Sequence, residues 1–235
     1  MTVEVSIADG VATLALSRPE VRNALNLEMC DALLAASRRI VDGNVQLAFV
    51  RGHGPAFCAG ADLNERKGKS HEWIRERRMR AFAAYAALEA LPMPCVALVH
   101  GAVIGSGVEI AAACDFIVAT PDATFRTPEA QRGTVGATQR LPRILGKRLA
   151  KDMMFTGRSL TATEARDAGL VSRIGDLDAE KRAIAEAILK APRLALKLAK
   201  RAIDRGVELD PAGALQTEIE AIEEQLSAGQ WMGKS

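Results

Sequence analysis

The chain has 235 residues, of which 49% are hydrophobic, enough for a sizeable core and too many for a disordered protein. Lys and Arg number 31 and Asp and Glu number 29, so the net charge is +2. This near balance argues against bulk binding to nucleic acid or to a membrane surface. The longest apolar tract, residues 95–120, contains His100, Glu109, Asp115 and several glycines, which a membrane span would hardly tolerate.

Cysteine usage and the first residues bear on the compartment. The four cysteines form no CxxC pair and lie in apolar contexts, as reduced core thiols do. The opening MTVEVSIADG has neither a basic start nor an apolar run, so we expect no secretory signal. Both observations predict a cytoplasmic protein.

The first third of the chain predicts a hairpin, a helix and a buried strand. Residues 3–16 alternate apolar and polar around Asp9-Gly10, which is a hairpin signal because Gly accepts the positive φ of a tight turn. Asn26 is the expected N-cap of a helix that ends near Val41. Residues 45–52 read as a buried strand, and the loop HGPAFCAGADL follows it.

The middle of the chain continues the alternation of helices and strands. A helix is predicted over 65–91, with Gly68 and Ser70 as interruptions near its start. The next predicted elements are a strand at 95–99, a helix at 106–114, and strands in DFIVAT and ATFRT.

From Pro128 onward the pattern is mostly helical. Thr161 and Glu164 form a capping box, and Asp210-Pro211 places a cap before a first-turn proline. Strands alternating with helices and then helices alone predict an α/β fold with a helical C-terminal part.

Three short segments could carry chemistry, and each has a purely structural alternative. FCAGADL, residues 57–63, could present free backbone N–H groups, or could be an ordinary strand-to-helix turn. GAVIGSGVE, residues 101–109, lets backbone approach a ligand, but Ser106-x-x-Glu109 could equally be a capping box. In TPEAQRG, residues 127–133, Pro128 would start a helix and Glu129 could simply compensate its dipole.

Taken together, FCAGAD, GSGVE and PE, in that order after buried strands, resemble the enoyl-CoA hydratase/isomerase (crotonase) superfamily. The resemblance extends to SRPEVRNALN, TQRLPRILG and FTGRSLTATEARDAGLV and covers nearly the whole chain. It implies a spiral of ββα units over residues 1–175, carrying the active site, and a helical C-terminal region over 176–235 for assembly into a trimer or a dimer of trimers.

The resemblance also implies the site residues. The backbone N–H groups of Ala61 and Ser106 would form an oxyanion hole for a thioester carbonyl, and Glu109 and Glu129 would be catalytic. The family often has glycine in place of Ser106, but a backbone donor survives that change. The residues that would bind the coenzyme A substrate are Arg22, Ala24, Ala59, Gly60, Asp62, Leu63 and Gly105.

Keeping both glutamates favours hydration of a 2-enoyl-CoA, because members that only shift double bonds commonly lack the first. Glu109 would activate water and Glu129 would deliver a proton. No metal is expected, and no cofactor beyond the coenzyme A of the substrate. The alternatives are an isomerase or another oxyanion-hole reaction on an acyl-CoA, and a non-catalytic CoA- or RNA-binding member of the fold.

Two segments depart from simple expectation. The turn between Glu129 and Gln139 is about three residues shorter than is common in family hydratases, which predicts a more open acyl pocket that tolerates bulky or ring-bearing groups. Residues 65–80 hold ten charged residues, seven of them basic. We interpret this run as a solvated helix face, with attraction of coenzyme A phosphates or RNA as the alternatives.

Overall fold

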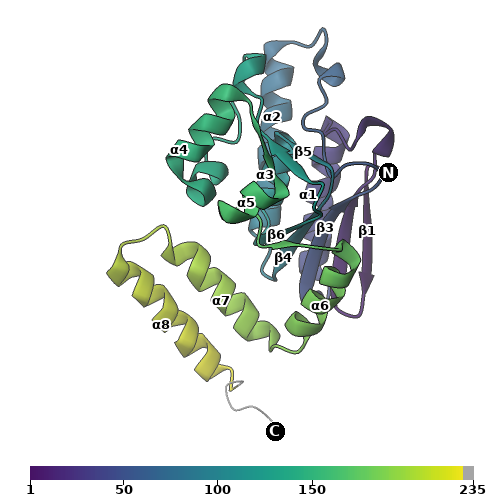
Figure 1. Cartoon of the computed structure of the whole chain (residues 1–235). Coiled ribbons are helices and arrows are strands. Elements are labelled where there is room, and N and C mark those ends of the chain that lie inside the picture. Colours follow the sequence, from purple (N-terminus) through teal and green to yellow (C-terminus); the bar gives the residue numbers. More distant parts are fainter. Residues whose placement is uncertain (230–235) are drawn as a thin grey trace.

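The computed structural model describes residues 1–229, so the last six residues of the region 176–235 lie outside the described part. It has a mixed α/β fold with two sheets (Figure 1). The larger sheet has the order β1 (Val3–Ala8), β2 (Val11–Leu16), β3 (Leu47–Gly52), β4 (Cys95–Val99), β6 (Phe116–Ala119), β9 (Arg173–Ile174). The smaller sheet has the order β5 (Ala102–Ile104), β7 (Thr124–Arg126), β8 (Ser159–Thr161).

Residues 1–229 contain eight α-helices. They are α1 (Leu27–Asp42), α2 (His71–Glu89), α3 (Ser106–Ala112), α4 (Arg140–Thr156), α5 (Ala162–Asp167), α6 (Leu177–Leu189), α7 (Arg193–Gly206) and α8 (Pro211–Ser227). Three short 3-10 turns add to them: η1 (Pro19–Val21), η2 (Asn64–Arg66) and η3 (Ala130–Arg132). The predicted α/β class with a helical C-terminal part is confirmed.

The predicted hairpin is present. β1 pairs antiparallel with β2, and Asp9 and Gly10 connect them with φ of 49° and 78°. From β2 to β9 all neighbours are parallel. Parallel strands covered on both faces need apolar residues on both, and β3 and β4 are almost entirely buried.

Each face of the larger sheet has its own cover. Phe49 and Leu98 point to one face, where Ile184 of α6 packs against them. Val50 and Ala97 point to the other face, into the core that α1 and α2 share. This alternation explains why short, continuous apolar runs form the central strands.

Helix starts follow the capping signals in the sequence. Asn26, Thr161 with Glu164, and Asp210 cap α1, α5 and α8 as predicted. The helix predicted from Glu65 is wrong in its first turns, because η2 and Gly68 (φ 71°) come first and Ser70 caps α2. Because of this break, Arg66 lies on η2 and not on α2.

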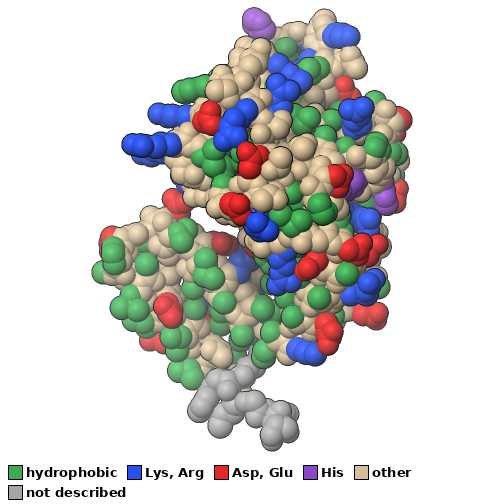
Figure 2. Space-filling model, in the orientation of Figure 1, with side chains coloured by type: hydrophobic (Ala, Val, Ile, Leu, Met, Phe, Trp, Pro, Cys, Tyr) green, Lys and Arg blue, Asp and Glu red, His purple; other side chains and the backbone are tan. Residues whose placement is uncertain are grey.

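Helices α7 and α8 lie side by side and project from the rest of the molecule (Figure 1). Figure 2 shows hydrophobic side chains gathered over this part. Five large apolar residues of the pair are exposed: Ile203, Leu215, Ile219, Ile222 and Leu226.

Two further observations concern the whole described chain. All four cysteines are free and buried, as the sequence predicts. Within residues 1–229, none of the helices has the length and the apolar character that crossing a membrane requires.

Candidate active site

Two glycine-rich loops form the floor of the site. The loop after β3 lies along β5, because the Cys58 N–H donates to the Ala102 carbonyl at 3.1 Å and the Ile104 N–H donates to the Cys58 carbonyl at 2.9 Å. A side chain at Gly107 would collide with that Cys58 carbonyl. The close approach therefore depends on glycine at this position.

Each loop presents a backbone donor to the same cavity. Ala61 and Ser106 both line it. Among the described residues, none accepts a hydrogen bond from the N–H of Ala61 or of Ser106. Ser106 is the first residue of α3, where a helix leaves its N–H groups free and carries positive partial charge. The expected pair of donors thus belongs to residues that line one cavity, and within the described part of the chain neither donor is used.

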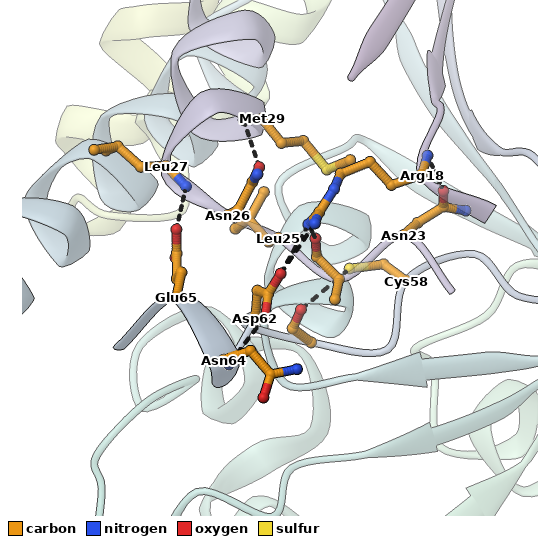
Figure 3. A network of polar contacts seen from close by, with 12 residues as sticks. Arg18, Asn23, Leu25, Asn26, Leu27, Met29, Cys58, Asp62, Asn64 and Glu65 are labelled. Atoms are coloured by element: carbon orange, nitrogen blue, oxygen red, sulfur yellow. Dashed lines mark hydrogen bonds and ion pairs between the residues drawn. The ribbon is translucent and has the colours of Figure 1, made fainter. Parts of the chain in front are cut away.

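A third segment is paired with the first loop. The Ala59 N–H donates to the Arg22 carbonyl at 2.9 Å, and the Leu25 N–H donates to the Gly60 carbonyl at 2.7 Å. The Arg18 guanidinium reaches Asp62 Oδ2 at 3.1 Å and also bonds the Ala24 carbonyl (Figure 3). Asp62 therefore holds the two segments together.

The predicted substrate-binding residues fall into two groups. Three of them, Gly60, Leu63 and Gly105, line the cavity. The other four lie on the paired segments outside its wall: Arg22, Ala24, Ala59 and Asp62.

The cavity has a volume of about 320 Å³ and its exposed wall is mainly apolar. It lies between the loops, α2, the start of α3 and the turn after Glu129. Glu109 and Glu129 both line it, so the structure brings together the two carboxylates and the two backbone donors.

Glu109 lies on α3 and is only 8% exposed. The capping-box interpretation of Ser106 and Glu109 is wrong: the N-cap is Gly105, with no side-chain cap bond. Gly105 adopts φ 50° and ψ −106°, so the helix begins one residue earlier than that box requires. The Glu109 carboxylate instead accepts from Arg140 Nη1 at 3.3 Å, and Arg140 also binds Glu89 at 2.6 Å.

Glu129 follows the buried Pro128 and precedes only the single turn η3. The predicted helix starting at Pro128 is therefore wrong, and a helix dipole cannot account for Glu129. A Cβ at Gly105 would lie 2.6 Å from Glu129 Oε1, and one at Gly136 would lie 3.3 Å from the same atom. The carboxylate is thus seated where two residues lack side chains.

The electrostatic setting of Glu129 differs from that of Glu109. Its Oε2 is buried without a hydrogen-bond partner among the described residues. Burial raises the pKa of Glu129, and the nearby Glu109 carboxylate adds to the increase. A raised pKa enlarges the protonated fraction, which suits a group that donates a proton.

Two residues of the site were missed by the sequence reasoning. Tyr85 of α2 is 2% exposed, and the Arg140 guanidinium lies 6.0 Å from its ring centre. Burial raises the pKa of Tyr85, although the adjacent Ser106 side chain opposes this increase. Arg140 lies within TQRLPRILG, whose resemblance to the family was the available signal. In the sequence, Tyr85 resembles an ordinary core residue of a helix, so no signal marked it as part of the site.

The site has no obvious metal-binding geometry. Within residues 1–229, no group of three or more His, Cys, Asp or Glu side chains is placed to hold a metal ion.

Comparison with known proteins places this chain in a family. A family model described as enoyl-CoA hydratase/isomerase matches residues 6–231. YngF of Bacillus subtilis, whose name assigns it to enoyl-CoA hydratases/isomerases, is 37% identical over 92% of this chain and 86% of its own. The enoyl-CoA isomerase/hydratase fer4 of Mycosarcoma maydis is 33% identical over 93% of this chain and 86% of its own.

The fold agrees with this assignment. The solved structure of an enoyl-CoA hydratase from Mycobacterium smegmatis superposes with a TM-score of 0.92 and 32% identity. The match covers 100% of this chain and 93% of that one. The chain therefore belongs to the enoyl-CoA hydratase/isomerase family of the crotonase superfamily.

Proposed function

We propose that the protein hydrates a 2-enoyl-CoA to a 3-hydroxyacyl-CoA. One observation carries the proposal: Glu109 and Glu129 line a single cavity together with the free N–H groups of Ala61 and Ser106. Hydration of an enoyl thioester requires a base, an acid and a site for developing negative charge, and these groups supply all three.

The thioester carbonyl oxygen accepts from the N–H groups of Ala61 and Ser106. This polarisation makes the β-carbon electrophilic and stabilises the enolate that forms when oxygen adds to it. Backbone donors fixed in place need no reorganisation during the reaction, and removing one such donor typically costs roughly 10²–10³ in kcat.

Glu109 is the base. Its carboxylate pairs with the Arg140 guanidinium, and Arg140 is in turn held by Glu89. Ionised Glu109 removes a proton from water as the water oxygen bonds to the β-carbon.

Glu129 is the acid. Its carboxyl is buried and unpartnered, and its raised pKa favours the protonated state. It delivers a proton to the α-carbon as the enolate collapses. One water is then added across the double bond, and proton exchange with solvent restores both carboxyl groups.

Isomerisation of a 3-enoyl-CoA is the second candidate. The observation that favours it is the Glu109–Arg140 ion pair, which competes with water for Glu109 and leaves Glu129 as the unpaired carboxyl. One such carboxyl can move a proton between the α- and γ-carbons without water.

The substrates themselves separate these candidates. Purified protein is mixed with crotonyl-CoA, and the enoyl-thioester absorbance and the product mass are followed. Hydration predicts loss of absorbance and a product heavier by one water. A protein that leaves 2-enoyl-CoA unchanged but converts 3-enoyl-CoA to 2-enoyl-CoA would be an isomerase. Coenzyme A binding without turnover of either would show a non-catalytic member of the fold.

The remaining proposals concern partners. Coenzyme A enters as part of the substrate, with no further cofactor, and the chain assembles as a trimer or a dimer of trimers. The exposed apolar face of α7 and α8 supports assembly.

A further inference from the structure

The wall of the cavity holds four arginines beside its two glutamates. Arg66 lies on η2, Arg77 and Arg78 lie on α2, and Arg132 lies on η3; all four line the cavity. The first three belong to the charged run at residues 65–80, so interpreting that run as only a solvated face is wrong. Four guanidinium groups are unexpected around a cavity whose exposed wall is mainly apolar.

One of the four is accounted for by the fold. Arg77 is 2% exposed, donates to Glu65 Oε1 at 2.6 Å and bonds the Leu25 carbonyl. Glu65 in turn accepts from the Leu27 N–H at 2.8 Å. Arg77 therefore connects α2 to the start of α1 and is compensated for its burial.

Arg66 and Arg78 have no such ion-pair partner. Within residues 1–229, no carboxylate forms an ion pair with either. The Nε of Arg66 is buried and has no hydrogen-bond partner in that part of the chain. A buried donor without a partner is costly, because it has lost water and gained nothing in exchange.

The charges on the wall act on one another. Burial lowers the pKa of Arg66, and the charges of Arg77 and Arg78 lower it further. Arg78 and Arg132 also act to lower the pKa of Glu129, against the larger effect of its burial. An anion in the cavity would offset this crowding of positive charge.

Resting on the proposed function, we propose that the acyl group carries its own carboxylate, which Arg66 and Arg78 bind. The substrate class is then the mono-thioester of an unsaturated dicarboxylic acid. A guanidinium matches a carboxylate in shape and charge, and charge-assisted hydrogen bonds of this kind are about twice as strong as neutral ones.

The phosphates of coenzyme A are the other anions that could reach arginine. The long pantetheine arm separates them from the thioester, whereas Arg66 and Arg78 line the same cavity of about 320 Å³ as Glu109 and Glu129. A cavity of that size holds the acyl end of the substrate and cannot also hold the nucleotide. The geometry therefore favours the acyl carboxylate.

The test compares two substrates of similar size, one with a charged end and one with an apolar end. Glutaconyl-CoA carries a distal carboxylate, and its neutral isostere has an isopropyl group in that place. The wild-type protein should show a higher kcat/KM for the acid. Arg66→Gln and Arg78→Gln should each lower the ratio of the two kcat/KM values by roughly ten- to a hundredfold, the effect of one hydrogen bond to a charged group.

The matched control is Arg75→Gln. Arg75 is exposed on the same helix and does not line the cavity, so the ratio should stay at the wild-type value. Equal kcat/KM values for the two substrates in the wild-type protein would overturn the proposal. The proposal would also be overturned if Arg66→Gln and Arg78→Gln weakened the binding of both substrates and of free coenzyme A by the same factor. The arginines would then bind phosphate.

Failure of this proposal and failure of the proposed function are distinguishable. Hydration of crotonyl-CoA without any preference for the acid refutes only the carboxylate site. If no thioester is turned over, calorimetry can still test the carboxylate site. It compares the affinity for glutaryl-CoA with the affinity for its isopropyl isostere. Tighter binding of the acid that Arg66→Gln abolishes supports the site, and equal binding refutes it.

Discussion

At the scale of single residues, Glu109 and Glu129 are two carboxyl groups in one cavity with opposite surroundings. One is paired with Arg140, and the other is buried without a partner among residues 1–229. Glu109→Gln and Glu129→Gln should each lower kcat by roughly 10²–10⁴, the usual contribution of a positioned acid or base. Steady-state kinetics with a 2-enoyl-CoA measures this effect. A Glu109→Gln variant that loses stability but keeps its rate would contradict the assignment.

The raised pKa of Glu129 has a consequence for stability. Its ordinary value is 4.5, and burial raises the folded-state value above this. Between the two values the folded protein binds more protons than the unfolded chain, so stability is lost as pH rises through that window. Glu129→Gln should remove this loss. The stability of the variant relative to wild type should therefore increase as the pH rises from below 4.5 to neutral.

Urea unfolding at several pH values measures that difference. The control is Glu28→Gln, which replaces an exposed carboxyl remote from the cavity. The difference in the free energy of unfolding between wild type and Glu129→Gln should depend on pH. If it stays constant, the burial of Glu129 does not make the stability depend on pH.

Ser106 separates backbone chemistry from side-chain chemistry. Ser106 lines the cavity and its N–H has no acceptor among residues 1–229, whereas its hydroxyl lies next to Tyr85 and does not cap α3. Ser106→Ala and Ser106→Gly should therefore keep most of the activity. Ser106→Pro deletes the donor and should cost roughly 10²–10³ in kcat.

The proline variant is informative only if it folds and still binds coenzyme A, which circular dichroism and calorimetry establish. An inactive Ser106→Ala that binds coenzyme A normally would make the hydroxyl the working group. Hydration as proposed would then have to be abandoned.

At the scale of elements, the turn after Glu129 positions the acid. A Cβ at Gly136 would lie 3.0 Å from Glu129 Cγ and 3.4 Å from Cδ. Gly136→Ala should therefore displace the carboxyl and lower kcat by roughly tenfold or more, because misplacing a reacting group by even 1 Å can cost about 10² in rate. The unfolding midpoint should change little, since the turn is near the surface.

Gly43→Ala is the matched control. At Gly43 a Cβ would meet its nearest atoms at 3.5–3.7 Å, an ordinary contact distance, and φ is −83°. Kinetics and thermal unfolding of both variants complete the comparison. Full activity in Gly136→Ala would show that the turn does not position Glu129.

At the scale of the whole molecule, α7 and α8 project with an apolar surface. Leu198, Ile203 and Leu215 line a hollow of about 710 Å³ between them, and Ile203 and Val207 are 64% and 76% exposed. Exposed apolar area of this kind marks an interface. We expect a trimer or a hexamer by light scattering, and Ile203→Asp should shift the protein to smaller species. A monomer at every concentration tested would contradict this.

Much of the fold was predictable because its signals are local. The Asp9-Gly10 turn, the Asn26 cap and the apolar runs of β3 and β4 each act through neighbours in the sequence. The errors were also local. Gly105 and Ser106 both suit a helix start, and the competition between them decides whether Glu109 caps the helix or faces the cavity.

The candidate site was predictable only in part. Through their resemblance to the family, short motifs within the loops predicted two donors and two carboxylates, and all four residues line the cavity. Tyr85 and Arg66 line the cavity, and Arg140 contacts Glu109 and the Tyr85 ring. These three residues come from elements that only tertiary packing brings together. A run of charges reads the same in sequence whether its arginines face solvent or a cavity.

The central claim is that Glu109 and Glu129 add water across a carbon–carbon double bond. Its most direct test is turnover of a 2-enoyl-CoA in water labelled with oxygen-18 and deuterium, with mass spectrometry and NMR of the product. The account predicts oxygen-18 at the β-carbon and deuterium at the α-carbon of the product. It also predicts that Glu109→Gln and Glu129→Gln each form this labelled product more slowly than the wild-type protein does. A product labelled with deuterium but containing no oxygen from water would contradict hydration and identify double-bond migration instead.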